Sequence, residues 1–386
     1  MSKRSVVLDK MNGAIITHPG LEAVSGKEVK ELIGVDAEMK RSVALFTPKK
    51  IEDFCTLCYR SQSAVKVLYV LFSSRFRRLE ELLPKIDGLD LSEWLEGKTF
   101  CVRSKIVENE GVDTMESERL IGEVIHEKYK AKVDLEKPDI PLFAYFIGND
   151  FYFGIDFAGF DMSKRNYRIF SLSDSVKATV SYALVRLAGY KKGMTLLDPF
   201  VQSGTVAIEA AFFATKKPIN FYNKDKFAFF KFPQFKDFNF DNFFEKNDKF
   251  DADIKGITAS DSQQRHVKAA EKNAKVAGVN KLINFTRLDV EWLDTKFEKQ
   301  SVDRIISNPP KVSRLLTEKG IEKLFQELFY TADFILKKDG RIVLLAKNYK
   351  QILNHASRHN FELKANFPFM QGKEEFSVLI FEREKK

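Results

Sequence analysis

The sequence predicts an α/β protein with a doubly wound parallel sheet in its C-terminal half and smaller α+β units in its N-terminal half. In the C-terminal half, short apolar segments alternate with segments of helical periodicity, which is typical of parallel sheets with helices on both faces. In the N-terminal half, apolar segments are joined both by tight turns and by helices. The chain of 386 residues is long enough for two or three domains with their own cores.

The C-terminal half begins with MTLLDPF at 194–200, which predicts a short strand that ends in Asp-Pro, followed by a helix at 205–214. Strand and helix signals then continue to alternate. The further strands are expected at 253–261, 283–290, 302–310 and 340–348, and the further helices at 267–278 and 321–336. The segments 361–369 and 375–383 flank a turn near Gly372, so they predict a closing antiparallel pair.

The N-terminal half predicts two α+β units in succession. For the first unit, strands are expected at 13–18, 42–47 and 64–72, and helices at 21–34 and 51–60. For the second unit, a strand is expected at 99–107, a helix at 117–130, and a hairpin within 141–159. The hairpin should turn at Gly148-Asn149-Asp150, since such residues favour tight turns.

One segment differs from the rest of the chain in composition. Residues 221–250 contain eleven Phe and one Tyr, interleaved with Lys and Asp, between the first helix and the second strand of the C-terminal half. Disordered linkers are depleted in aromatic residues, so this segment should be ordered. Either its rings fix a long connection onto the sheet, or one or two of them stack on RNA bases.

Composition and charge limit the class of protein. With 63 basic and 54 acidic residues the net charge is +9, which suits a polyanionic partner such as RNA but also serves solubility alone. No apolar run is long enough for a membrane span, and the N-terminal MSKRSVVLDK lacks the apolar core of a signal peptide. The three cysteines, Cys55, Cys58 and Cys101, fit a reducing compartment. We therefore expect a cytoplasmic protein with no membrane partner.

Acidic residues stand at the ends of three predicted strands: Asp198, Asp261 and Asp289. Ligands of doubly wound sheets bind beyond the carboxyl ends of the strands, so these side chains predict a site there. An acid after the second strand suits a ribose diol, because a carboxylate accepts two hydroxyl hydrogen bonds. Between the first acid and the helix lies PFVQSGT at 199–205, in which Gly204 would let a ligand approach the backbone closely.

The sequence SNPPK at 307–311 stands at the end of the fourth predicted strand and is the candidate catalytic segment. An exocyclic base amine is a poor nucleophile, because its lone pair is delocalised into the ring. The Asn308 side-chain carbonyl and the Pro309 backbone carbonyl would accept its two N–H groups and orient the nitrogen toward an activated methyl group. An isolated Asn-Pro-Pro is usually a plain turn, but its place behind three strand-end acids predicts methylation of a base amine.

These motifs resemble a known family. DPFVQSGTVAIEAA at 198–211, KAAEKNAKVAGV at 268–279 and IISNPP at 305–310 are similar to class I S-adenosylmethionine-dependent methyltransferases that modify base amino groups. The N-terminal stretches resemble a THUMP domain and its exit segment: FCVRSKIV at 100–107, ESERLIGEVIHEKYKAKVDLEKPD at 116–139 and FYFGIDFAGFDMSKRNYRI at 151–169. Together they resemble the THUMP-containing tRNA guanine-N2 methyltransferases of archaeal type.

The resemblance implies an α/β, Rossmann-like class I methyltransferase domain at 163–386, preceded by a ferredoxin-like domain at 1–85 and a THUMP domain at 86–162. It implies methylation of a guanine N2 amine in tRNA, with S-adenosyl-L-methionine as cofactor and the THUMP domain on the tRNA acceptor end. We expect a monomer without a metal ion.

The resemblance also implies roles for individual residues. Asp261 would hold the cofactor ribose and Asp289 the adenine amine. The methionine part would lie along Ser203, Gly204 and Thr205. The implied cofactor site also includes Asp198, Pro199 and Asn308, and the implied catalytic segment is Asn308, Pro309, Pro310 and Lys311.

The chain departs from the family pattern at positions near the implied site. Gln202 stands where the pattern has Gly, and Ser-Gln-Gln follows Asp261 where relatives often place a second acid. Lys311 replaces the aromatic residue that stacks on the target base, a contact worth roughly 1–3 kcal/mol. A ring of the 221–250 segment would replace that contact, or Lys311 would grip the phosphate of the flipped nucleotide.

Other activities fit less well. Methylation of pyrimidine carbon 5 needs a cysteine nucleophile, and no cysteine follows position 101. A zinc deaminase would need His and Cys ligands that are missing, and Cys55 and Cys58 are better explained as two cysteines on one helix face. Two alternatives remain: a catalytically silent THUMP RNA-binding protein, and an N-methyltransferase that acts on a different base amine in tRNA or rRNA.

Two basic clusters are candidates for RNA contacts. Lys164, Arg165 and Arg168 lie in the segment that joins the THUMP and methyltransferase parts. Arg75, Arg77 and Arg78 belong to SRFRR at 74–78. Either cluster would bind phosphates or form a solvated face, and phosphate contacts would position RNA without choosing the base.

Overall fold

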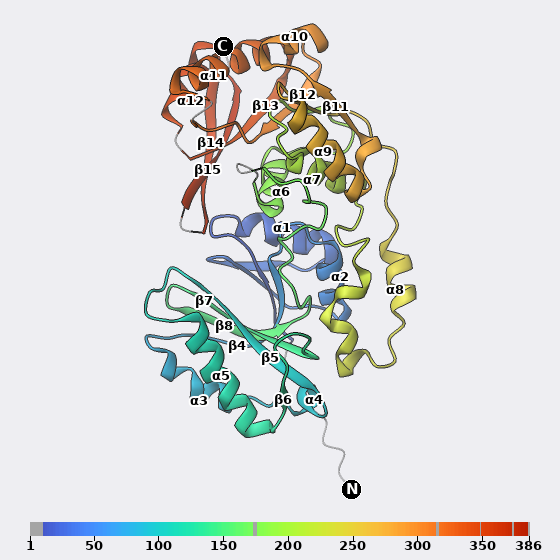
Figure 1. The fold of residues 1–386 in the computed structure, drawn as a ribbon, viewed down its shortest axis with the longest axis vertical. Helices are drawn as coiled ribbons and strands as arrows, with labels where there is room; N and C mark the ends of the chain where they lie inside the picture. The colour runs from blue at the N-terminus through green and yellow to red at the C-terminus, as the bar shows by residue number, and fades with distance from the viewer. Residues whose placement is uncertain (1–10, 173–175, 314–315, 348, 373, 385–386) are drawn as a thin grey trace. The chain divides into compact units, whose positions relative to one another are not determined.

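The computed structural model describes residues 11–172, 176–313, 316–347, 349–372 and 374–384 (Figure 1). The chain forms two compact units. The N-terminal unit consists of Met1–Met162 and Asn220–Asn247, and the C-terminal unit of Ser163–Ile219 and Asp248–Lys386. The segment MSKRSVVLDK, on which the expected location partly rests, lies outside the described residues. Across the described ranges, the helices are too short or too polar to cross a bilayer.

The N-terminal unit is built on a sheet with the strand order β2-β3-β1-β4-β8-β7-β5-β6. Its strands are β1 Gly13–Ile16, β2 Ala37–Lys40, β3 Val43–Phe46, β4 Lys66–Arg75, β5 Thr99–Val107, β6 Lys132–Val133, β7 Ile140–Ile147 and β8 Asp150–Asp156. The hairpin predicted within 141–159 is confirmed as β7–β8, and its turn contains Gly148 with a φ of 54°. β7 is buried along its whole length and pairs with β5 in parallel, so it forms the centre of this part of the sheet.

Short and long helices accompany this sheet. They are α1 Glu22–Ile33, α2 Glu52–Arg60, the 3₁₀ turn η1 Leu79–Glu81, α3 Leu83–Asp87, α4 Ser92–Leu95 and α5 Thr114–Tyr129. The Asp113 side chain caps α5 by accepting the Glu116 N–H at 2.9 Å. In α2, Cys55 and Cys58 are fully buried and burial raises the pKa of both thiols, so they are core residues of a helix face, as expected.

The aromatic segment 221–250 contributes most of its length to the N-terminal unit. It forms η2 Lys224–Lys226, η3 Ala228–Lys231, η4 Pro233–Phe235 and α8 Phe240–Asn247. Six of its rings are buried in the core of that unit: Phe227, Phe229, Phe232, Phe235, Phe243 and Phe244. Phe232 packs edge-on against Trp94 and Phe157, with ring centroids 5.5 and 5.0 Å apart. The packing interpretation is therefore confirmed for these rings, but they pack on the N-terminal unit rather than on the C-terminal sheet.

The C-terminal unit confirms the predicted doubly wound sheet, with the strand order β11-β10-β9-β12-β13-β15-β14. Its strands are β9 Leu196–Asp198, β10 Ile257–Asp261, β11 Ile283–Arg287, β12 Val302–Ser307, β13 Leu336–Ala346, β14 Phe361–Gln371 and β15 Glu374–Arg383. The first five run parallel, and β15 joins β13 and β14 in the antiparallel pair that the sequence predicts.

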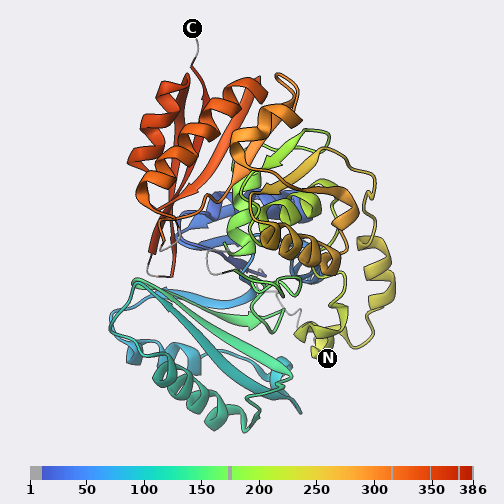
Figure 2. The ribbon, with the colours of Figure 1, turned by 45° about the horizontal axis from the view of Figure 1, so that its top comes forward.

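Helices cover both faces of this sheet (Figure 2). They are α6 Ala178–Leu187, α7 Thr205–Thr215, α9 Gln264–Ala277, α10 Leu293–Lys296, α11 Glu318–Ile335 and α12 Lys350–Arg358, with the turns η5 Asn280–Leu282 and η6 Val290–Trp292. α10, α11 and α12 share one apolar core with the sheet. α6 and α12 were not predicted. α6 is buried over most of its surface, so its sequence lacks the polar stripe of an amphipathic helix.

The chain reverses its direction across the sheet between β9 and β12. From β9 it continues to β10 on one side, whereas from β12 it continues to β13 on the other. Such a switch point leaves a crevice at the carboxyl ends of the two strands. Those ends carry Asp198 and Ser307, and the segment Asn308–Lys311 follows directly.

Candidate functional site

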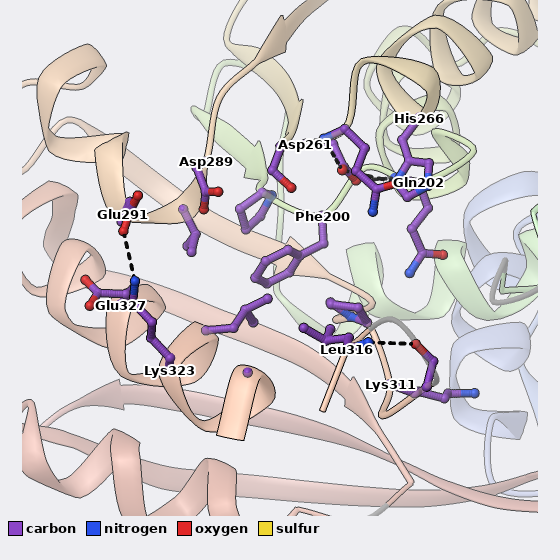
Figure 3. Close-up of a pocket in the computed structure, with 18 of the residues that line it drawn as sticks. Phe200, Gln202, Asp261, His266, Asp289, Glu291, Lys311, Leu316, Lys323 and Glu327 are labelled. Atoms are coloured by element: carbon purple, nitrogen blue, oxygen red, sulfur yellow. Dashed lines mark hydrogen bonds and ion pairs between the residues drawn. The ribbon is translucent and has the colours of Figure 1, made fainter. Parts of the chain in front are cut away.

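A cavity of about 830 Å³ opens at the carboxyl edge of the C-terminal sheet (Figure 3). We call it the outer cavity. Residues predicted for the site that line it are Pro199, Asp261, Asp289, Pro310 and Lys311. The Phe200 ring projects into it, and Gln202 forms part of its wall. Ligand pockets typically measure about 300–1,000 Å³, so the outer cavity has the size of a cofactor site.

Asp261 ends β10 and is held in place by its neighbours. Its Oδ1 accepts the Gln263 N–H at 3.0 Å, and its Oδ2 accepts the Gln202 N–H at 3.2 Å. His266, in the first turn of α9, brings Nδ1 to 3.0 Å from Asp261 Oδ1. The sequence analysis did not connect His266 with the site, although its position five residues after the strand-end acid was a usable signal.

Asp289 lines the outer cavity, and in Figure 3 it lies to the left of Asp261, whereas Gln202 lies to the right. Asp289 precedes η6, in which Val290 is buried and lines the same cavity. Two charged residues also line this cavity, and Lys323 Nζ of α11 lies 3.5 Å from Glu291 Oε2. The two acids expected to hold a nucleoside, Asp261 and Asp289, therefore face one cavity.

Asp198 is buried at the end of β9 rather than in the outer cavity. Its Oδ1 accepts the Ser307 hydroxyl and the Phe200 N–H, the latter at 3.3 Å. Burial raises the pKa of this carboxyl to about 7, and the nearby charge of Asp261 adds to the rise. Asp198 lines a second, much smaller pocket of about 10 Å³ with Ser203, Thr205 and Asn308. We call it the inner pocket.

Gly204 has a left-handed φ of 82° at the start of α7. A Cβ atom at this position would lie 2.8 Å from the Cβ of Ala270 in α9. The predicted reason for this glycine was a close ligand approach. The structure adds a second one, because α7 and α9 can pack this closely only without a side chain at 204.

The segment Asn308–Lys311 spans the two cavities. Asn308 and Pro309 are buried, whereas Pro310 and Lys311 line the outer cavity. Lys311 is exposed and places Nζ 5.0 Å from the ring centre of Phe376 in β15. Gln202 contacts Asn308 twice: its Nε2 donates to the Asn308 backbone oxygen at 3.0 Å, and Asn308 Nδ2 donates to Gln202 Oε1 at 3.4 Å.

The residues present fit the nucleoside part of the cofactor that the resemblance implies, but not its amino-acid part in the present arrangement. The outer cavity has room for a nucleoside beside Asp261 and Asp289. The inner pocket, at about 10 Å³, is no larger than a single water molecule requires, so an amino-acid group does not fit there beside the Gln202 side chain.

One predicted RNA contact is wrong. Arg165 is buried and its Nε donates to Glu209 Oε1 at 3.1 Å, with both side chains almost fully enclosed. The Tyr167 hydroxyl donates to the same carboxylate oxygen at 2.8 Å. This network fixes the segment after Met162 onto α7, so the Arg165 guanidinium is not accessible to a phosphate. Lys164 remains exposed, and Arg168 is half-buried.

The second basic cluster lies in the N-terminal unit. Arg75, Arg77 and Arg78 are all exposed, at and just after the end of β4. Arg75 Nε is 3.6 Å from Asp150 Oδ1, a distance at which an exposed ion pair is weak. All three guanidinium groups are therefore accessible to a polyanion.

Comparison with known proteins matches both parts of the chain. A sequence model described as RMKL-like, methyltransferase domain matches residues 165–374, and one described as THUMP domain matches residues 76–156. The chain is 26% identical over 373 residues to tRNA (guanine(6)-N2)-methyltransferase of Methanocaldococcus jannaschii, covering 94% of this chain and 97% of that protein.

Two further similarities concern an rRNA enzyme and a solved structure. Ribosomal RNA large subunit methyltransferase K/L of Buchnera aphidicola is 26% identical over 313 residues, which cover 70% of this chain and 45% of that protein. The crystal structure of SMU.472 complexed with SAH superposes with a TM-score of 0.81 at 23% identity, covering 98% of this chain and all of that one. This structural likeness bears on the fold.

Proposed function

Because the chain belongs to the RMKL-like methyltransferase family, we propose that it methylates the exocyclic N2 amine of a guanine in tRNA. The predicted methyltransferase class and its cofactor, S-adenosyl-L-methionine, follow from this membership. The proposal that the target is a base amine rests on the position of Asn308-Pro309-Pro310. This segment follows β12 at the switch point, beside three strand-end acids. Similarity over nearly the whole chain to an enzyme named for guanine N2 supports the choice of base.

The cofactor-binding roles that we propose are those that the resemblance implies, and the two cavities support them. S-adenosyl-L-methionine, when bound, supplies an electrophilic methyl group. Asp261 accepts hydrogen bonds from the ribose hydroxyls, since its carboxylate is already oriented by Gln263 and Gln202. Asp289 accepts from the adenine amine. Asp198 and Ser203 to Thr205 would hold the amino-acid part once the inner pocket has widened.

Asn308 and Pro309 bind the guanine amine. The Asn308 side-chain oxygen and the Pro309 backbone oxygen accept its two N–H groups, which draws the nitrogen lone pair out of conjugation and fixes its direction. No strong base is needed, because the amine becomes acidic as its nitrogen forms the new bond. Pro310 and Lys311 follow directly and line the outer cavity.

RNA binding is assigned to the N-terminal part, which contains the THUMP match. We propose a ferredoxin-like domain at 1–85, a THUMP domain at 86–162 that holds the tRNA acceptor end, and a methyltransferase domain at 163–386, of which Asn220–Asn247 pack with the N-terminal unit. Arg75, Arg77, Arg78, Lys164 and Arg168 would contact phosphates and position the RNA without selecting the base. A monomeric, cytoplasmic enzyme fits this scheme.

A second target has its own support. The similarity to an rRNA methyltransferase and the presence of Lys311 in place of an aromatic platform favour a different base amine, in rRNA, as the alternative. The catalytically silent alternative is disfavoured, because Asp198, Asp261, Asp289 and Asn308 are all in place.

Two measurements test the proposal. Calorimetric titration of S-adenosyl-L-methionine should give micromolar binding to the wild-type protein, and Asp261→Ala should abolish it. Mass spectrometry of nucleosides from treated tRNA should then show N2-methylguanosine with the wild type and none with Asn308→Ala, which keeps Asp261 and Asp289. Methylation of rRNA but not tRNA would establish the alternative, and a wild type that binds no cofactor would refute the enzyme.

A further inference from the structure

Both Phe200 and Gln202 line the inner pocket as well as the outer cavity, and Gln202 is the polar one of the two. Gln202 is 8% exposed, although it stands in a loop at the mouth of the site. Its φ of 48° lies in the left-handed region, which residues other than glycine, asparagine and aspartate adopt rarely. The loop therefore holds Gln202 in an uncommon conformation that directs its amide inward.

The Gln202 amide is bonded to the residue proposed to bind the target amine. Its Nε2 donates to the Asn308 backbone oxygen at 3.0 Å, and its Oε1 accepts from Asn308 Nδ2 at 3.4 Å. The backbone N–H of Gln202 donates to Asp261 Oδ2. One residue thus connects the strand-end acid of β10 with the catalytic segment after β12.

The small volume of the inner pocket gives this contact a functional meaning. Asp198, Ser203, Thr205 and Asn308 surround only about 10 Å³ while Gln202 bonds to Asn308. The outer cavity beside Asp261 and Asp289 is far larger, at about 830 Å³. A nucleoside can therefore bind without disturbing Gln202, whereas an amino-acid group attached to it cannot.

We propose that Gln202 is a latch on the inner pocket: its side chain must release Asn308 before the amino-acid part of the cofactor can bind. This inference rests on the proposed function. Release opens the space around Asp198 and removes the contacts of Gln202 with the backbone oxygen and Nδ2 of Asn308.

The test compares two probes that differ only in the amino-acid part. Adenosine fills the outer cavity alone, and S-adenosyl-L-homocysteine requires the inner pocket as well. Dissociation constants of both are measured by calorimetry for the wild type and for Gln202→Asn. Asparagine tolerates the left-handed backbone and keeps an amide, but it is one methylene too short to reach Asn308.

Gln300→Asn is the matched control, because Gln300 also has a left-handed φ, of 55°, at an exposed position outside both cavities. Gln202→Asn should bind S-adenosyl-L-homocysteine about tenfold more tightly, because binding no longer has to break the two Gln202–Asn308 hydrogen bonds, with unchanged affinity for adenosine. The control should match the wild type for both probes.

Each other outcome overturns the latch in a distinct way. Unchanged or weaker binding of S-adenosyl-L-homocysteine by Gln202→Asn would refute it while leaving the proposed function intact. An equal gain for adenosine would show that the substitution acts on the outer cavity instead. If neither the wild type nor the variant bound S-adenosyl-L-homocysteine, the latch and the proposed function would both fail.

Discussion

Arg165 and Glu209 form an ion pair in the interior of the C-terminal unit, with Nε and Oε1 3.1 Å apart and both side chains almost fully buried. A buried pair of this kind is weak evidence of net stabilisation, but the loss of one partner leaves an uncompensated charge in a medium of low dielectric constant. The segment that follows Met162 is therefore fixed to α7 by a contact that tolerates little change.

Glu209→Gln should lower the free energy of unfolding of the C-terminal unit by about 3–5 kcal/mol, because the Arg165 charge loses its counter-charge inside the protein. Denaturant titration would measure this loss. Asp251→Asn is the control, since its ion pair with Lys192 is about half exposed and should contribute at most about 1 kcal/mol. Equal losses in the free energy of unfolding for the two variants would show that the buried Arg165–Glu209 pair is no more sensitive to substitution than the exposed one.

The stability of the C-terminal unit should fall as pH rises from about 4 to about 7, because of Asp198. Its ordinary pKa is 3.8, and burial raises the pKa to about 7 in the folded protein. In this interval the unfolded chain loses the proton while the folded protein retains it, so rising pH favours unfolding, by up to about 4 kcal/mol in total.

Asp198→Asn should remove this pH dependence, since an amide does not titrate. Urea titrations at pH 5 and pH 8 should show the variant gaining stability relative to the wild type at the higher pH. Asp294→Asn, at an exposed position, should show the same difference from the wild type at both values. If the free energy of unfolding of Asp198→Asn differed from that of the wild type by the same amount at both pH values, the wild-type Asp198 carboxyl would already be ionised at pH 5.

Lys311→Met should weaken tRNA binding and make it less sensitive to salt, if Lys311 grips a phosphate. The slope of log K against log salt should fall by slightly less than one, since one phosphate contact is lost. Fluorescence anisotropy at several salt concentrations would measure the slope, and Lys311→Arg should preserve it. An unchanged slope in the methionine variant would show that Lys311 serves mainly as a partner of the Phe376 ring.

Phe232→Ala should destabilise the N-terminal unit by about 3–5 kcal/mol, because it removes a buried ring between Trp94 and Phe157. Phe230→Ala, in the same segment but 37% exposed, should cost much less. Hydrogen exchange, read separately for peptides of each unit, would assign the loss. If Phe232→Ala loosened only the C-terminal unit, the assignment of this segment to the N-terminal core would be wrong.

Much of the C-terminal sheet and part of the site could be predicted, because they depend on local patterns. The alternation of apolar segments with segments of helical periodicity predicted the strands. Acids placed directly after the strands were expected to meet at one edge of a parallel sheet. Asp261 and Asp289 line one cavity for this reason. The roles assigned to these residues remain predictions until binding is measured.

The rest depends on contacts between side chains that are distant in the sequence. Gln202 and Asn308 are 106 positions apart, and Arg165 and Glu209 are 44 apart. No local pattern shows that these pairs meet, so Gln202 was interpreted only as a missing glycine and Arg165 only as one member of a basic cluster. Gly204 was assigned to a ligand approach for the same reason, because its neighbour Ala270 belongs to a later helix.

The order in which a ribosome makes this chain does not match the order in which its cores can be completed. The N-terminal unit needs the rings of Asn220–Asn247, but Ser163–Ile219 of the other unit are synthesised first. At about 5–20 residues per second, the surface around Trp94 and Phe157 waits on the order of ten seconds for its covering rings. The nascent protein is therefore most exposed to misassociation after its first half has emerged, and that interval is where a chaperone would be most useful.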